Sequence, residues 1–337
     1  MKNVLITEDK ECVLKLSHPE WSDKVCVFGA RAKRLTNDDE AAILSWTDDE
    51  VMLHWDRWDT EWFVKEDDGV FHHRYGLPAS DNDRACLAPE ERKKVAVLYI
   101  ATGRYIVFWQ EFHKACRQYF LNGHDVHYFL FTDHDEIEVD EDTTLIRKEF
   151  YPWPMETLRR FETFLSIEHI LSGFDYMYFL NANLLPVAPI REEVFPSPEQ
   201  GLMVTIHPGY YRQPRHTWTY ERNSVSEACI PSGQGEIYAM GAFNGGSAAA
   251  FLRMCRELDQ AVKRDLSNGV IAVWHDESHL NKYILGRSLL VLTPEYLLPE
   301  YVVYNQDILN PLKKMAKMIM LDKNRSKYGA LDWLRQL

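Results

Sequence analysis

The sequence predicts an α/β protein with a Rossmann-like mixed sheet, preceded by a small, mainly antiparallel β domain. Three continuous apolar runs, at 95–101, 127–132 and 176–180, carry the main part of this prediction, because each ends abruptly in polar residues. Such runs are typical of buried parallel strands, and the stretches 105–121 and 155–172 have helical spacing. Ligands of open α/β sheets bind at the carboxyl ends of the strands, so we expect the functional site there.

The first 88 residues have a different pattern. Their apolar residues alternate with polar ones over short segments, and Asp-rich turns separate those segments. Alternation of this kind is typical of antiparallel strands with one face in solvent. The segments that we expect to be strands are 25–28, 41–46, 51–55, 61–65 and 70–75.

These two patterns divide the chain into domains. We expect a β accessory domain over 1–88, a linker over 89–94 and the main domain over 95–337. The whole stretch 77–94 contains prolines and charges and has little apolar periodicity. The role of the accessory domain stays open between a module that binds a glycan or protein and a solubilising or dimerising appendage.

Composition and charge exclude several classes of protein. The net charge of −13 argues against a non-specific nucleic-acid binder, although residues 312–337 are locally basic and indicate an anionic ligand or a solvated helix face. The six cysteines are scattered without a C-x-x-C pair, as in a reduced cytoplasmic protein. No apolar run reaches the roughly 18 residues of a membrane-spanning helix, and the first residues turn acidic too early for a signal peptide. We therefore expect a cytoplasmic protein and leave its oligomeric state open.

Two asparagines, Asn181 and Asn183, directly follow the third apolar run. Nucleotide-sugar transferases often have Asp-x-Asp at this place, where the carboxylates hold a divalent cation against the diphosphate. Asparagine is a poor ligand for a hard cation, but its amide can hydrogen-bond a sugar hydroxyl or a phosphate oxygen. The alternative is a capped strand end. If the asparagines bind a donor diphosphate, protein cations must balance its charge, and the candidates are Lys323, Arg325 and Lys327.

The densest polar cluster of the chain is the sequence WHDESHLNKY at 274–283. Trp274 can stack on the apolar face of a sugar. The adjacent carboxylates of Asp276 and Glu277 offer two roles, one binding sugar hydroxyls and the other facing a reacting anomeric carbon.

Two other interpretations of this cluster stay open. His275 and His279 have the i, i+4 spacing of a helical zinc site, but the zinc pattern needs Glu directly after the first histidine, and Asp276 is there instead. The cluster is also compatible with a simple helix N-terminus capped by Asp276 and Ser278.

Several short motifs occur in one order across 95–327: TGRYI, HPGYY, TYER, IP-x-G-x-G, GG, WHDESHLNKY and TPEYL. Together they resemble glycosyltransferase family 6, which includes the histo-blood-group A and B transferases and the α-1,3-galactosyltransferases. Bacterial members of that family are similar to this chain in having N-x-N where the animal enzymes have D-x-D. Roughly the first 90 residues lie outside the resemblance.

The resemblance implies a GT-A fold, a retaining reaction and a set of site residues. Glu277 falls on the candidate nucleophile of the family, and Asp276 and Arg160 fall on donor-sugar contacts. The uridine-binding strand and turn correspond to Tyr99, Ile100, Ala101 and Tyr105, and the donor site includes Asn181, Asn183 and His275. Acceptor contacts correspond to His207, Thr219 and Trp274.

A triplet, Met240-Gly241-Ala242, falls on the residues that select the donor in this family. Met and Ala at its ends resemble the galactose-using members, because their side chains fill the space that an acetamido group needs. The chain departs from the animal pattern after Tyr296, where Leu298-Pro299 replaces Trp-Asp and removes an acceptor-binding carboxylate. Glu300 is our candidate to replace it.

The resemblance therefore predicts transfer of galactose from UDP-galactose, in α-1,3 linkage, to a β-galactoside that carries a 2-fucosyl group, which gives a blood-group-B-like product. It predicts no divalent metal and no cofactor beyond the UDP-sugar substrate. The alternatives are UDP-N-acetylgalactosamine as donor, with a blood-group-A-like product, and a sugar-binding protein without catalysis. Glu277 acts either by double displacement or on the front face of the donor. A lipid-linked glycan acceptor would bring the protein to a membrane surface, and no nucleic-acid partner is expected.

Overall fold

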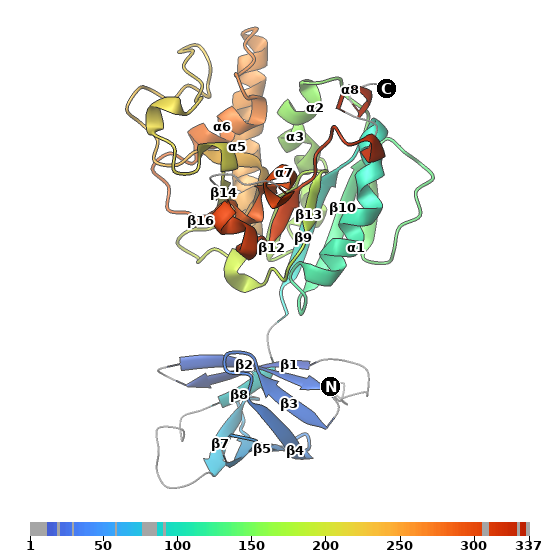
Figure 1. The fold of residues 1–337 in the computed structure, drawn as a ribbon, viewed down its shortest axis with the longest axis vertical. Helices are drawn as coiled ribbons and strands as arrows, with labels where there is room; N and C mark the ends of the chain where they lie inside the picture. Colours follow the sequence, from blue (N-terminus) through green and yellow to red (C-terminus); the bar gives the residue numbers. More distant parts are fainter. Residues whose placement is uncertain are drawn as a thin grey trace. The chain divides into compact units, whose positions relative to one another are not determined.

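The computed structural model describes residues 12–18, 21–28, 30–57, 59–75, 86–89, 92–304, 310–328 and 331–334. The chain divides into two compact units, Met1–Arg92 and Lys93–Leu337 (Figure 1).

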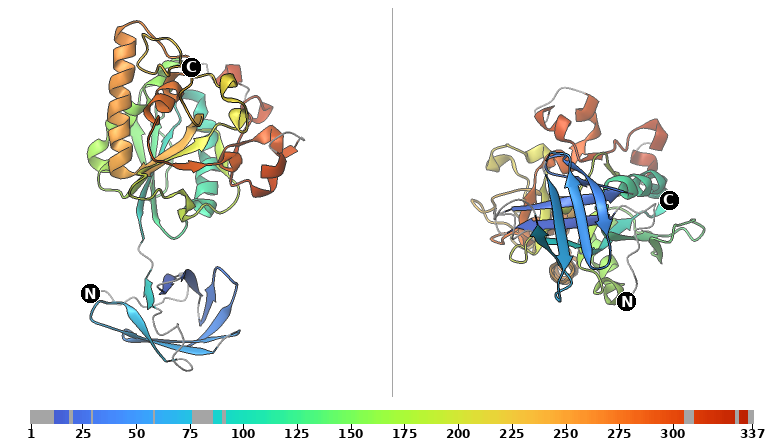
Figure 2. Two further views of the ribbon diagram at one scale, coloured as in Figure 1. Left: turned by 90° about the vertical axis from the view of Figure 1, so that its left-hand side faces the viewer. Right: turned by 90° about the horizontal axis from the view of Figure 1, so that it is seen from below.

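The N-terminal unit is an antiparallel sheet that closes on itself, because β1 pairs with both β2 and β8 (Figure 2). Its core is apolar and comes from alternate residues of each strand, such as Val25 and Val27 or Val51 and Leu53, so the pairing follows the sequence alternation. The strands are β1 (Cys12–His18), β2 (Trp21–Phe28), β3 (Arg31–Arg34), β4 (Glu40–Trp46), β5 (Glu50–Trp55), β6 (Thr60–Lys65), β7 (Phe71–Tyr75) and β8 (Cys86–Pro89).

All five strands expected in this unit are confirmed, whereas β1, β3 and β8 were not predicted. The expected linker is wrong at Pro89, because this residue ends β8, and at Lys94, because β9 begins there. The strand β8 closes the sheet by pairing with β1 and β7, and its Leu87 is buried in the core. A four-residue strand is too short to give a periodic signal. Residues 90 and 91 of the expected linker, and residues 77–85 of the aperiodic stretch 77–94, lie outside the described residues.

The larger unit contains a mixed sheet in the order β11-β10-β9-β12-β15-β14-β16. The three strands predicted from apolar runs are confirmed as β9, β10 and β12, and they are mutually parallel, whereas β15 runs antiparallel to its neighbours β12 and β14. The strands are β9 (Lys94–Ile100), β10 (Asp125–Thr132), β11 (Thr143–Arg147), β12 (Tyr176–Leu180), β14 (Leu202–Ile206), β15 (Ala239–Ser247) and β16 (Leu290–Leu292).

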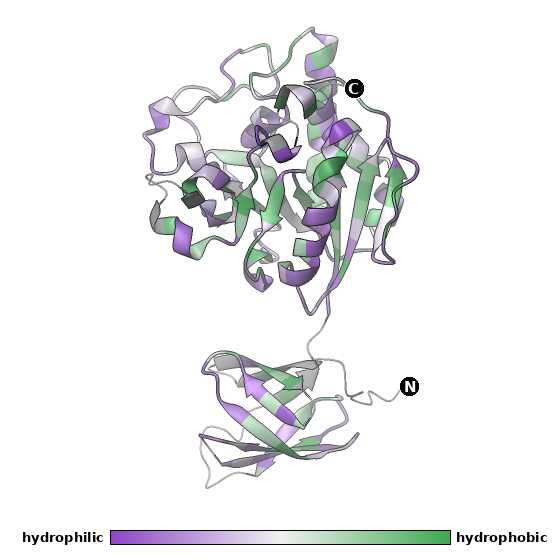
Figure 3. Ribbon diagram, turned by 45° about the vertical axis from the view of Figure 1, so that its right-hand side comes forward, coloured by the Kyte–Doolittle hydropathy of each residue, from purple (hydrophilic) through white to green (hydrophobic). Residues whose placement is uncertain are grey.

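Each face of this sheet is covered by its own apolar cluster. Along β9, Val95, Val97 and Tyr99 face one cluster, while Ala96 and Leu98 face the other. The first cluster includes buried residues of α1 and of the C-terminal segment, and the second those of α3, α5 and α6. Figure 3 shows the apolar strands between helices whose outer faces are polar. Burial on both faces explains why these strands are continuous apolar runs.

The helices differ from the sequence prediction in their breaks. The expected helix over 105–121 begins as a 3-10 turn, η2 (Gly103–Phe108), before α1 (Trp109–Tyr119). The stretch 155–172 is divided into three short helices, because the backbone at Arg159 and Ile167 leaves helical geometry. The helices are α1, α2 (Met155–Leu158), α3 (Arg160–Leu165), α4 (Glu168–Leu171), α5 (Ala248–Ser267), α6 (His275–Tyr283), α7 (Glu300–Tyr304) and α8 (Leu331–Leu334).

A second, small sheet ties the C-terminal segment to the large unit. It has the order β13-β18-β17, with β13 (Leu184–Pro186), β17 (Leu298–Pro299) and β18 (Met318–Met320). Because β13 follows the two asparagines directly, this sheet brings the basic C-terminal residues beside the end of β12. Within the described ranges, no helix is long and apolar enough to cross a membrane.

Candidate active site

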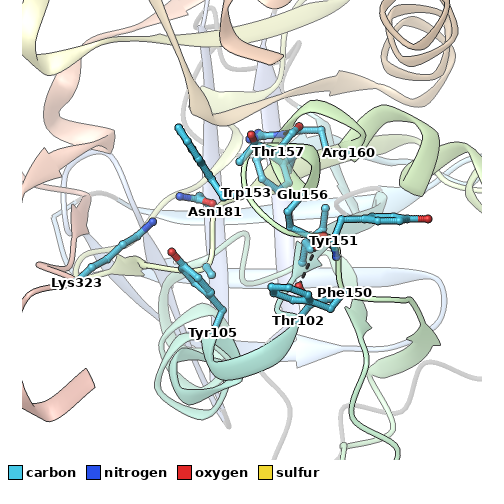
Figure 4. Close-up of a pocket in the computed structure, with 13 residues that line it drawn as sticks. Thr102, Tyr105, Phe150, Tyr151, Trp153, Glu156, Thr157, Arg160, Asn181 and Lys323 are labelled. Carbon is cyan, nitrogen blue, oxygen red and sulfur yellow. Dashed lines mark hydrogen bonds between the residues drawn. The ribbon is translucent and has the colours of Figure 1, made fainter. Parts of the chain in front are cut away.

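A pocket opens at the carboxyl ends of β9 and β12, as expected for an open α/β sheet. Its wall comes from the ends of the two strands, the 3-10 turn η2, the loop before α2, the helices α2 and α3, and the C-terminal segment (Figure 4). The lining residues are Ile100, Thr102, Tyr105, Phe150, Tyr151, Trp153, Glu156, Thr157, Arg160, Phe179, Asn181, Ala182 and Lys323.

A buried ion pair stands beside this pocket. Arg160 Nη2 lies 2.9 Å from Asp276 Oδ2, and both side chains are less than a tenth exposed. Arg160 Nη1 also donates to the carbonyl of Gly241 at 2.8 Å, and its guanidinium lies 4.3 Å from the centre of the Phe179 ring. Burial raises the pKa of Asp276 to about 6, against the opposing effect of Arg160. The pair is therefore held rigidly, and its Arg160 side chain lines the pocket.

The Glu277 carboxylate is oriented by the neighbouring strand. Its Oε2 accepts the backbone N–H of Gly241 at 2.9 Å. Burial raises the pKa of Glu277 to about 7; the Gly241 N–H opposes this rise, the neighbouring charge of Asp276 adds to it, and the nearby Tyr238 hydroxyl lowers the pKa. Glu277 thus changes charge near neutral pH, in the range useful to a catalytic carboxyl group.

Within the described part of the chain, His275 and His279 belong to no group of three or more possible metal ligands. His275 is the first residue of α6 and has a positive φ of 52°, in the left-handed region. The His275 ring packs edge-on against Trp153, at a centroid distance of 5.0 Å. His279 is buried on the helix and lies 3.4 Å from Asp265 Oδ2, so the two histidines have different partners.

An exposed aromatic platform lies next to Glu277. Trp274 is 47% exposed, and its Nε1–H donates to Thr219 Oγ1 at 2.6 Å. Thr219 Oγ1 also lies 2.7 Å from the Tyr210 hydroxyl and 3.4 Å from that of Tyr238. The indole is therefore fixed at its edge while its surface stays open for stacking on a sugar. These contacts link the predicted acceptor residues to the carboxylate through Tyr238.

His207 belongs to the same aromatic group. Its Nδ1 accepts the N–H of Gly209 at 3.0 Å, and its ring contacts Tyr210 and Tyr238. Burial lowers the pKa of His207 to about 4, so the imidazole is neutral at physiological pH. Since Nδ1 accepts, the proton is on Nε2, which can donate to an acceptor hydroxyl.

The two asparagines have different positions. Asn181 lines the pocket, whereas Asn183 is buried. Asn183 Nδ2 donates to the carbonyl of Leu321 at 2.8 Å, and its Oδ1 accepts from Asn181 Nδ2 at 2.9 Å. In this structure the Asn183 side chain therefore contacts the C-terminal segment and not the pocket.

The three predicted cations are also separated. Lys323 lines the pocket, with its Nζ 5.1 Å from the centre of the Tyr105 ring (Figure 4). Arg325 is paired with Glu300 at 2.9 Å, and Lys327 with Glu111 at 2.7 Å. Of these three predicted cations, Lys323 is the one that lines the pocket.

Glu300, which we expected to bind the acceptor, is only 4% exposed. Besides its pair with Arg325, its Oε2 accepts the N–H of Asp322 at 2.8 Å. The expectation is not supported by this geometry, because the carboxylate oxygens are used inside the protein.

The predicted uridine-binding residues divide between pocket and core. Ile100 and Tyr105 line the pocket. The Tyr99 side chain lies in the core, where its hydroxyl donates to the carbonyl of Ala182 at 2.8 Å, and Ala101 is fully buried. In the donor triplet, Ala242 is buried and Met240 is half-buried against the core.

Three residues near the site were not singled out from the sequence: Trp153, Glu156 and Tyr238. Glu156 accepts from Thr102 Oγ1 at 2.9 Å and from Lys148 Nζ at 2.7 Å, and so joins the turn after β9 to α2 in the pocket wall. The prolines on both sides of Trp153 are a signal that could have marked it as an exposed loop aromatic. Tyr238 and Glu156 become recognisable only from their contacts.

A pocket at the strand ends, the neighbouring carboxyl groups of Asp276 and Glu277 and an exposed tryptophan are features expected of an enzyme that transfers a sugar. Comparison with known proteins identifies its family. The sequence model of glycosyltransferase family 6 matches residues 89–327, so the chain belongs to this family. The protein is therefore a hexosyltransferase, and its family implies a nucleotide-sugar donor and a glycan acceptor.

Three relatives illustrate the similarity. The O-antigen biosynthesis glycosyltransferase WbnI of Escherichia coli is 34% identical over 238 residues, which are 70% of this chain and 97% of the relative. The histo-blood group ABO system transferase 2 of Rattus norvegicus is 32% identical over 232 residues, with 66% and 68% covered. The globoside α-1,3-N-acetylgalactosaminyltransferase 1 of Mus musculus is 31% identical over 254 residues, with 72% and 68% covered.

Proposed function

We propose that this protein is a retaining α-1,3-galactosyltransferase of GT-A fold that uses UDP-galactose without a divalent metal. Its acceptor is a β-galactoside with a 2-linked fucose. The observation that carries the proposal is the Glu277 carboxylate, held by the Gly241 N–H between the Arg160–Asp276 pair and the open indole of Trp274.

In this proposal the donor extends along the pocket. Uridine lies against Ile100 and Tyr105, and the galactose hydroxyls bind Arg160 and Asp276. The diphosphate lies between the Asn181 amide and the Lys323 ammonium, which both line the pocket. An amide donor and a cation together offer hydrogen bonds and charge to phosphate oxygens, as a metal would.

The reaction breaks the bond between the anomeric carbon and the UDP oxygen and forms a bond to O3 of the acceptor, whose proton is released. Ionised Glu277 either attacks the anomeric carbon and is then displaced, or stabilises the positive charge that develops there. The leaving UDP gains negative charge, which Lys323 stabilises. The acceptor galactose stacks on Trp274, with the neutral His207 donating to one of its hydroxyls.

A second donor, UDP-N-acetylgalactosamine, is favoured by the names of the globoside relatives. A Cβ at position 241 would lie 3.0 Å from Asp276 Oδ2, so this contact is enough to favour glycine there. Gly241 therefore does not indicate which donor is used. Met240 and Ala242 then carry the preference for galactose. Competing both donors at equal concentration and weighing the products by mass spectrometry decides between them, and a product larger by an acetamido group would refute our assignment.

The acceptor class is tested with a panel of galactosides with and without fucose. The name of the Escherichia coli relative favours an O-antigen-type glycan, and a lipid-linked form would bring the protein to a membrane surface. We expect the fucosylated members to react fastest. Release of UDP in their presence would also exclude a sugar-binding protein without catalysis.

Metal independence is tested by assaying transfer in EDTA. We expect the rate to stay within about twofold of the untreated enzyme, because Lys323 and Asn181 replace the cation. Complete loss in EDTA, restored by Mn²⁺ or Mg²⁺, would refute this part of the proposal.

A further inference from the structure

Residues on both sides of Lys323 are held by groups from other parts of the fold. On the N-terminal side, Leu321 is fixed twice by Asn183: its N–H donates to the Asn183 carbonyl and its carbonyl accepts from Asn183 Nδ2, both at 2.8 Å. On the same side, Glu300 accepts the N–H of Asp322 at 2.8 Å, and on the C-terminal side it pairs with the Arg325 side chain at 2.9 Å. Lys323 is thus the centre of a five-residue segment with fixed ends.

The two carboxylate oxygens of Glu300 have separate partners. Oε2 accepts from the backbone of Asp322, and Oε1 faces Arg325 Nη1. Glu300 is 4% exposed, whereas the Arg325 side chain is 42% exposed. A buried carboxylate needs both partners, because burying it without them is costly. Glu300 therefore constrains the segment strongly, and its use in binding an external sugar would break these contacts.

A long lysine side chain loses much rotamer freedom when it is ordered at a ligand. Lys323 points from the fastened segment to the pocket wall beside Tyr105 (Figure 4). A backbone that is fixed before the ligand binds reduces the conformational entropy that is lost on binding, which is the effect of preorganisation. The position of the ammonium then depends on groups that do not touch the donor.

We propose that Glu300 is a positioning residue that fixes the backbone around Lys323 and so holds this ammonium at the donor diphosphate. The proposal rests on the proposed function, since it takes the diphosphate as the ligand of Lys323. It replaces the acceptor-binding role that the sequence suggested for Glu300.

The test compares Glu300→Gln, Lys323→Ala and the double variant. We measure the Kd of UDP by calorimetry and the initial rates with donor and acceptor varied separately. Each single change should weaken UDP binding roughly 10-fold, the scale of a hydrogen bond to a charged group. The double variant should bind UDP no more weakly than Lys323→Ala, because Glu300 acts through Lys323, and the acceptor KM should stay within about twofold. The proposal would be overturned if the double variant showed the product of the two single losses in UDP binding, or if Glu300→Gln raised the acceptor KM.

Two further variants separate positioning from general loss of structure. Arg325→Lys keeps the charge that pairs with Glu300 and should retain UDP binding, whereas Arg325→Ala should lose part of it. Glu138→Gln removes an exposed carboxylate of the same unit and is the matched control, with an unchanged Kd. If Arg325→Ala and Glu138→Gln behave alike, the pair with Glu300 does not position the lysine.

Hydrogen exchange supplies a readout that needs no substrate. The amides of residues 321–323 should exchange faster in Glu300→Gln than in the wild type, while those of α5 stay unchanged. Unchanged exchange at 321–323 would show that Glu300 does not fasten the segment. A wild-type protein that binds no UDP would overturn the proposed function and this role together. If the wild type binds UDP but the losses of the two single variants multiply in the double variant, only the positioning role is overturned.

Discussion

The backbone N–H of Gly241 donates a 2.9 Å hydrogen bond to Glu277 Oε2, so the strand that carries the triplet Met240-Gly241-Ala242 also orients the carboxylate that we propose as catalytic. The same residue's carbonyl accepts from Arg160. One peptide segment of β15 therefore aligns both charged groups that we place at the donor sugar.

Replacing Glu277 by glutamine should reduce the transfer rate roughly 1,000-fold or more, because the amide can neither attack the anomeric carbon nor carry negative charge there. UDP binding should stay within about twofold, since we place UDP on other residues. Initial rates and calorimetry on the same preparation give both values. A variant with wild-type turnover would remove Glu277 from the mechanism.

The rate should rise with pH through about 7. Burial raises the pKa of Glu277 to about 7, so the carboxyl group is protonated and inactive below this pH and ionised above it. The plot of log kcat/KM against pH should have a slope near one on the acid side and level off above neutrality. The remaining activity of Glu277→Gln should lack this pH-dependent step. A wild-type rate that is flat between roughly pH 5.5 and 8 would contradict the assignment.

Changing Asp276 to asparagine should destabilise the fold, because it leaves the Arg160 guanidinium buried without a counter-charge. Breaking a buried pair costs about 3–5 kcal/mol, which corresponds to a fall in Tm of roughly 10 °C for a unit of this size. The matched control is Arg264→Ala, which removes the exposed pair with Glu227 and should change Tm by about 2 °C or less. Equal falls in Tm in calorimetric scans of both variants would show that the Asp276 carboxylate stabilises the fold no more than an exposed ion pair does.

Trp274→Ala should raise the acceptor KM roughly 10-fold or more through lost stacking, with the donor KM unchanged. Thr219→Val keeps the indole but removes the hydroxyl that holds its edge at 2.6 Å, so we expect an intermediate increase. Kinetics with each substrate varied separately measure both effects. A change confined to the donor KM would place the acceptor elsewhere.

Removing residues 1–90 should leave kcat and both KM values on soluble acceptors within about twofold, because the larger unit has its own two apolar clusters. The mass in solution, measured by light scattering before and after removal, tests a dimerising role. A fall in kcat with retained folding would assign the N-terminal unit a part in catalysis.

Much of the fold could be predicted because burial on both faces makes β9, β10 and β12 continuous apolar runs. Asp276, Glu277 and Trp274 could be found for a related reason, since they are neighbours in the sequence and remain together in space. Strand β8 could not be predicted, because its place depends on closing a sheet with β1, some 70 residues earlier in the chain. Such pairings leave little local signal.

The sequence by itself indicated the family, the three apolar strands β9, β10 and β12 and a set of candidate site residues, because these depend on residue types and on short-range spacing. Only the tertiary structure decided which of these groups face the pocket. Tyr99 and Ile100 are adjacent, yet the first side chain is in the core and the second at the pocket, since successive side chains of a strand point to opposite faces. In the same way, the path of the C-terminal segment, set by contacts with Asn183 and Glu300, places Lys323 in the pocket wall and pairs Arg325 and Lys327 with other carboxylates.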